Sequence, residues 1–143
     1  MSRMSPTTQI YLSFNGECEA AFRFYEDRLG ATDMKMFPYA GSPMAVPPEW
    51  QTKVMHGSIT LGGVTVAGAD PPPGGYEHPQ GFRMFLESDD PAETERMFNA
   101  LAENGRIEMP LQQTFWSLRF GVLTDQFGIP WTISCAQPPE QTP

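Results

Sequence analysis

The stretch TFWSLRFGVLTDQFGIPWTI, Thr114–Ile133, predicts two β-strands joined by a tight turn. We expect the first strand from about Trp116 to Leu123 and the second from Ile129 to Ser134, because aromatic residues alternate with small ones in both. Asp125 can accept hydrogen bonds from the turn amides, and a glycine follows where a short loop needs a positive φ. Pro130 lacks an amide proton, so its strand is expected at a sheet edge or with the missing donor facing outward.

Outward from this hairpin, one order of elements occurs twice along the chain. Asn15 and Asp90 are the expected N-caps of two helices with apolar faces at helical spacing. A strand precedes each helix and three follow it, and Gly57 in the first copy matches Gly121 in the second. The expected strands are 9–14, 33–39, 53–61 and 64–67 in the first copy, and 82–86 and 107–111 before the hairpin in the second.

This repeat predicts an α+β fold of two tandem βαβββ modules within one domain, 1–143. The modules are expected at 9–70 and 82–135, with a Pro/Gly-rich linker at 71–81 and a disordered tail at 136–143. Neither module has enough strands to bury its own sheet face, so we expect the two to close on each other.

Composition excludes several classes of protein. The net charge is −8, which argues against nucleic acid and anionic membrane surfaces as partners, because both attract basic proteins. The sequence has no apolar run of membrane-spanning length, and its first eight residues lack the apolar core of a secretory signal. Cys18 and Cys135 are too few for a disulfide scaffold, so we expect a cytoplasmic protein with both thiols packed as small apolar groups.

His56 is the most informative single residue of the sequence. Strand alternation places it on a face with Ser58 and Thr60, while apolar neighbours face the other way. Its counterpart in the second module is Phe120. The histidine is therefore either a polar anchor or proton carrier in a pocket, or a partly buried ring bonded to a hydroxyl or carbonyl.

Arginines and aromatic residues supply the other candidate ligand contacts. Arg119 and Arg83 lie in predicted strands, where each could hold a carboxylate or phosphate or pair outward with a surface acid such as Glu87. Aromatic residues could line a pocket for a flat or cationic ligand, or each could simply pack in the core. These candidates are Trp50, Phe115, Trp116, Phe120 and Trp131. The Pro-rich segment 40–51, which contains Trp50, is either a loop packed over the core or a flap over a pocket or partner subunit.

Three motifs resemble those of the vicinal oxygen chelate superfamily, and within it the PhnB-like group. They are F-x-x-Y-x-x-x-L-G at Phe22–Gly30, M-H-G-S-I-T-L-G-G at Met55–Gly63 and F-W-x-x-x-F-G-x-L-T-D-x-F-G-I-P-W at Phe115–Trp131. The resemblance implies the glyoxalase/bleomycin resistance fold, with the sheets curled into a cup around a ligand, and a homodimer that can exchange modules. Some relatives carry a ubiquinone-methyltransferase label, but no Gly-rich loop here follows a strand and opens a helix, as nucleotide binding would require.

The superfamily's metal ligands stand on the first and last strands of each module. Here those strands offer only Glu87, so we predict no metal and no cofactor; a metal, if bound, would use His56 and Glu87. The leading hypothesis is a metal-free protein that holds a small organic ligand between His56, Ser58, Arg119 and the aromatic set. The alternatives are a divalent-metal-dependent lyase, isomerase or dioxygenase, and a dimeric assembly protein whose cup is filled with side chains.

Overall fold

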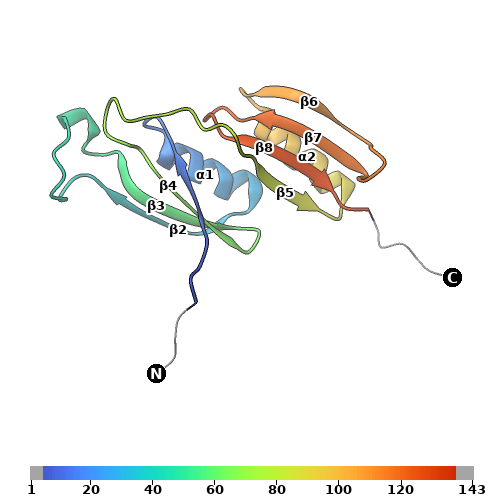
Figure 1. Cartoon of the computed structure of the whole chain (residues 1–143), viewed down its shortest axis with the longest axis horizontal. Helices are drawn as coiled ribbons and strands as arrows, with labels where there is room; N and C mark the ends of the chain where they lie inside the picture. The colour runs from blue at the N-terminus through green and yellow to red at the C-terminus, as the bar shows by residue number, and fades with distance from the viewer. Residues whose placement is uncertain (1–4, 138–143) are drawn as a thin grey trace. The chain divides into compact units, whose positions relative to one another are not determined.

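The computed structural model describes residues 5–137 and divides between Tyr76 and Glu77 into two compact units. Each unit contains one α-helix and one four-stranded sheet, and these elements are labelled in Figure 1. Within residues 5–137, two α-helices and eight strands in two mixed sheets confirm the predicted α+β class and the order of elements. Residues 138–143 of the predicted tail lie outside the described residues. No helix within 5–137 is both long and apolar enough to cross a membrane.

The first unit contains a sheet with the order β1-β4-β3-β2, in which β1 runs parallel to β4 and the other pairs are antiparallel. A 3₁₀-helix, η1, interrupts the segment before β3. The elements are β1 (Ile10–Ser13), α1 (Cys18–Leu29), β2 (Thr32–Pro38), η1 (Pro48–Trp50), β3 (Val54–Leu61) and β4 (Val64–Ala69).

The second unit repeats this arrangement with the order β5-β8-β7-β6, and β5 runs parallel to β8. Its elements are β5 (Met84–Ser88), α2 (Pro91–Ala102), β6 (Arg106–Gln112), β7 (Arg119–Thr124) and β8 (Pro130–Cys135). Of the two alternatives expected for Pro130, an edge strand is wrong, because β8 lies between β5 and β7. Pro130 is tolerated there as the first residue of the strand.

A glycine lets each helix approach its sheet closely. A Cβ atom on Gly57 in β3 would lie 3.4 Å from the Phe22 ring of α1, and one on Gly121 in β7 would lie 2.6 Å from the Phe98 ring of α2. Both phenylalanines are buried. The predicted match of these two glycines therefore has a packing reason, since each leaves room for a helix side chain over the third strand of its unit.

The two helix N-termini are capped differently. In α2 the N-cap is Asp90 as expected, and its Oδ1 accepts the amide proton of Ala92 at 3.0 Å. In α1 the expectation of Asn15 is wrong, because the N-cap is Glu17 and it makes no side-chain cap bond. Asp70 at the end of β4 replaces the local cap: its buried carboxylate accepts from the amides of Cys18 and Val54, both at 3.0 Å.

Candidate functional site

His56 stands on the face of the first sheet opposite α1, together with residues from both edge strands. Its Nδ1 lies 3.0 Å from the Tyr11 hydroxyl, and the two ring centroids are 5.6 Å apart. Phe37, its register partner on β2, stacks at 6.4 Å with an interplanar angle of 26°. Tyr11 is 56% exposed and Phe37 54% exposed, so these rings form a surface that solvent reaches. We call Tyr11, Phe37, His56 and Ser58 the histidine face.

A small residue between the strands allows these rings to meet. β4 separates β1 from β3, and its Ala67 pairs with Tyr11 on one side and with Ser58 on the other. Ala67 carries only a methyl group on this face and is buried. The Tyr11 side chain can therefore cross above β4 and reach the imidazole on β3.

The hydrogen bond to Tyr11 sets what His56 can offer. Burial, with a smaller contribution from Cys18, raises the pKa of Tyr11, so the phenol keeps its proton at neutral pH and can donate to Nδ1. A neutral imidazole that accepts at Nδ1 carries its proton on Nε2. The face then combines one N–H donor, the Ser58 hydroxyl and two flat rings, a set suited to a planar ligand with an oxygen acceptor.

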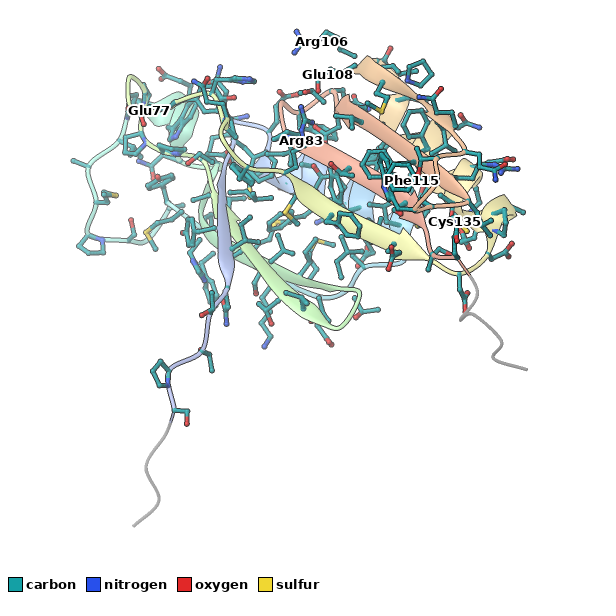
Figure 2. The ribbon with its side chains drawn as sticks, turned by 45° about the vertical axis from the view of Figure 1, so that its right-hand side comes forward. Glu77, Arg83, Arg106, Glu108, Phe115 and Cys135 are labelled. Atoms are coloured by element: carbon teal, nitrogen blue, oxygen red, sulfur yellow. The ribbon has the colours of Figure 1, made fainter. Side chains whose placement is uncertain are left out.

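In the second unit, aromatic side chains gather where the chain enters β7. Trp116 packs edge-on against Phe120 with centroids 5.3 Å apart, and Phe115 packs edge-on against Trp116 at 4.6 Å. Phe115 is 90% exposed and Trp116 53% exposed. We call these three residues the aromatic cluster. Phe115 is visible near the middle of this unit in Figure 2.

The second unit does not bring Arg119 or Trp131 to the aromatic cluster. Arg119 lies on the sheet face that packs against α2, where its Nε donates to Glu95 at 3.0 Å. Trp131 is 1% exposed, and its Nε1 donates to Asp125 at 2.9 Å. The first therefore forms an ion pair with the helix, and the second is a core residue.

Trp50 lies in η1, in the segment whose role the sequence left open. A Cβ on Gly16 would lie 3.2 Å from its ring, and Lys53 Nζ lies 5.8 Å from the ring centroid. The indole Nε1 is buried and has no hydrogen-bond partner. Backbone hydrogen bonds join the two ends of the segment, from Ala40 N to Gln51 O and, just outside it, from Tyr39 N to Lys53 O. Trp50 thus packs against its own unit.

The residues present do not fit a divalent metal centre. Within 5–137 no group of three or more His, Cys, Asp or Glu side chains lies close enough to hold a metal ion. His56 Nδ1 is engaged by the Tyr11 hydroxyl, and the His56 ring stacks beside Phe37. Glu87 belongs to the other unit.

Cys18 is not suited to nucleophilic chemistry. The residue is fully buried, and burial followed by the charges of Asp70 and Glu19 raises the pKa of its thiol far above the ordinary value. A thiol held in this protonated form is a poor nucleophile. Cys135 is also fully buried. Both cysteines are free, and their burial confirms the expectation that they pack as small apolar groups.

Comparisons with known proteins agree on one family. The family described as 3-demethylubiquinone-9 3-methyltransferase matches residues 6–134. Protein YjdN of Escherichia coli (strain K12) is 35% identical over an alignment of 134 positions, which covers 87% of this chain and 91% of that protein.

Solved structures give the same result for the fold. Protein PA1353 from Pseudomonas aeruginosa is 40% identical, with a TM-score of 0.84 over 94% of this chain and 100% of that one. A PhnB protein from Bacillus cereus is 22% identical, with a TM-score of 0.75 over 92% and 100%. A glyoxylase/bleomycin resistance protein/dioxygenase domain from Frankia sp. EAN1pec shares the fold at 12% identity, with a TM-score of 0.63 over 94% and 100%.

Proposed function

We propose a function from the premise that this chain belongs to the 3-demethylubiquinone-9 3-methyltransferase family, a PhnB-like group of the vicinal oxygen chelate superfamily. The protein binds a small planar organic molecule on the histidine face, without a metal. The observation that carries this proposal is the hydrogen-bonded, exposed Tyr11–His56 pair stacked beside Phe37.

The chemistry of that face supports recognition of a flat ligand with an oxygen atom at its edge. The exposed rings of Tyr11 and Phe37 provide flat surface on which an aromatic or enolic molecule can stack. The imidazole N–H and the Ser58 hydroxyl can orient the ligand through its oxygen. Tyr11 is 56% exposed and Phe37 is 54% exposed, so both side chains are accessible to a ligand.

Methyl transfer, which the family description names, finds no support in the residues at the helix N-termini. The Cys18 amide of α1 already donates to Asp70, and the Ala92 amide of α2 donates to Asp90. The N-terminus of each helix therefore already holds a carboxylate, whose negative charge disfavours the binding of a further anionic group at that position. The β1–α1 connection contains a single glycine, Gly16, rather than a Gly-rich loop. We therefore propose ligand binding and not methyl transfer.

The proposal is tested by a ¹H–¹⁵N NMR titration with planar aromatic acids and their saturated analogues, on protein purified without a His-tag. We expect planar ligands to shift the His56 and Phe37 amides, and His56→Ala and Tyr11→Phe to weaken binding. Val64→Ala, on the helix side of the same sheet, is the matched control. Shifts that are equal in wild type and His56→Ala would remove the histidine face from the site. Stoichiometric metal in the purified protein would overturn the metal-free reading.

The exposed aromatic cluster favours a second candidate, a homodimer formed through the second unit. An exposed, contiguous aromatic surface marks protein interfaces. The mass in solution, measured by light scattering, is expected to be that of a dimer and to fall toward that of a monomer in Phe115→Ser/Trp116→Ser. A monomeric wild-type protein at high concentration would contradict this candidate.

A further inference from the structure

A pocket of about 590 Å³ in the second unit carries charged side chains that the proposed function does not use. The segment His78–Phe82 forms one wall, and the end of the sheet forms the other through Arg83, Arg106, Glu108 and Thr124. Figure 2 shows Arg83, Glu108 and Arg106 gathered at one end of this sheet. For Arg83 the sequence left open whether it holds an anion or pairs with a surface acid, and it gave Glu108 and Arg106 no role in binding.

Strand register explains why these residues meet. Thr124 on β7 pairs with Arg106 on β6 and with Pro130 on β8, so one row crosses three strands at this end of the sheet. Arg83 immediately precedes β5, whose first residue, Met84, pairs with Trp131 next to Pro130. Arg83 therefore continues the row directly before the start of the fourth strand of this sheet, β5.

Glu108 holds both guanidinium groups at fixed positions. Its Oε2 lies 2.5 Å from Arg83 Nη2, and its Oε1 lies 3.1 Å from Arg106 Nη2 and accepts from the Thr124 hydroxyl at 3.2 Å. Arg83 Nη1 also donates to the carbonyl oxygens of Leu123 and Trp131, both at 3.4 Å. These bonds fix Arg83 to the backbone of β7 and β8.

This pocket carries an excess of positive charge and guanidinium N–H donors that the hydrogen bonds described above do not use. Two guanidinium groups face one carboxylate, which leaves a local charge of about +1 in a chain whose net charge is −8. Arg106 uses only Nη2 in the bonds described, and its side chain is 73% exposed. A guanidinium has five N–H donors, so Arg106 retains donors for an incoming group.

We infer that this pocket binds the carboxylate or phosphate group of a small organic anion. Arg106 supplies the free donors, Arg83 supplies a fixed second positive charge, and Phe82 and Pro79 provide apolar wall for the body of the ligand. Glu108 is a positioning residue that keeps the two guanidinium groups on one side of the pocket. The residues of the histidine face belong to the other unit and are not among those that line this pocket.

The test is a ¹H–¹⁵N NMR titration of the full chain with inorganic phosphate and with benzoate, each against sodium chloride at matched ionic strength. We expect both probes to shift the amides of Arg83, Arg106 and Thr124 more than chloride does. Arg106→Gln should weaken binding about fivefold or more, since it removes a charge-assisted contact. Arg96→Gln, which removes an exposed arginine of α2 in the same unit, is the matched control and should change binding less than about twofold.

Each outcome decides between an anion site and a structural ion-pair network. Shifts with both probes support a general organic-anion site, and shifts with only one identify the group that the site prefers. If Arg106→Gln and Arg96→Gln weakened binding equally, the effect would be one of net charge alone and the inference would be overturned. Amide shifts no larger than those caused by chloride would also overturn it. Unchanged urea midpoints in both variants would show that neither loses its fold. The His56 amide reports separately on the proposed function.

Discussion

Replacing Asp70 should strongly destabilise the first unit, although the residue lies between the end of β4 and the Pro-rich linker. The carboxylate is 1% exposed and accepts from the backbone amides of Cys18 and Val54. Hydrogen bonds to a charged group contribute roughly 1.5–3 kcal/mol each, and a buried amide without a partner carries a similar penalty. Asp70→Ala is therefore expected to lower the free energy of unfolding by about 3–5 kcal/mol.

Asp70→Asn separates the two bonds. One amide oxygen can still accept, but the NH₂ group must then face a second backbone donor, so we expect a loss of roughly 2–3 kcal/mol. Asp27→Ala, an exposed aspartate on α1, is the control and should change stability by no more than about 0.5 kcal/mol.

Urea unfolding followed by circular dichroism measures these differences, and hydrogen exchange locates them. In Asp70→Ala the amide protons of Cys18 and Val54 should both exchange about tenfold or more faster, in Asp70→Asn only one of them should, and amides in β7 and β8 should be unaffected in either variant. An Asp70→Ala variant within about 1 kcal/mol of the wild type, or with both amides still protected, would refute the reasoning.

Three further predictions test other contacts. Hydrogen bonds from Arg106 and Arg83 lower the pKa of Glu108 below the ordinary 4.5. The stability that Glu108 contributes is therefore present above about pH 4.5 and is lost as the pH falls. Between pH 5 and pH 3, the urea midpoint should decrease more in wild type than in Glu108→Gln. Gly121→Ala should cost about 1–3 kcal/mol, and more than Gly57→Ala, because its Cβ would lie 2.6 Å from Phe98 Cε2; equal costs in urea unfolding would contradict this. Neither Cys18 nor Cys135 should react with Ellman's reagent in the native protein, while both should react in guanidinium chloride.

Local patterns in the sequence were sufficient to predict the elements of the fold. In the β7–β8 turn, Asp125 Oδ1 accepts from the amides of Phe127 and Ile129 at 2.8 and 3.0 Å, as expected of a turn aspartate. The Asp90-Pro91 start of α2 was predicted for the same kind of local reason. Such features depend on residues within a few positions of one another, so alternation and capping chemistry reveal them.

Contacts between distant residues could not be predicted in this way. Asp70 caps α1 from 52 positions away, and the Tyr11–His56 bond joins residues 45 positions apart across β4. Alternation placed His56 and Ser58 on one face but could not show which strands flank them. For Arg119 it could not show that the side chain faces α2, because that depends on which side of the sheet the helix covers.

The sheet topology separates the chain at a single point. All strand pairings in the described residues join β1–β4 among themselves or β5–β8 among themselves, and residues 70–83 connect the two sets. A nick or an insertion between Tyr76 and Glu77 would therefore interrupt no hydrogen-bonded ladder. New termini placed there by circular permutation would leave each sheet encoded by one continuous stretch of sequence.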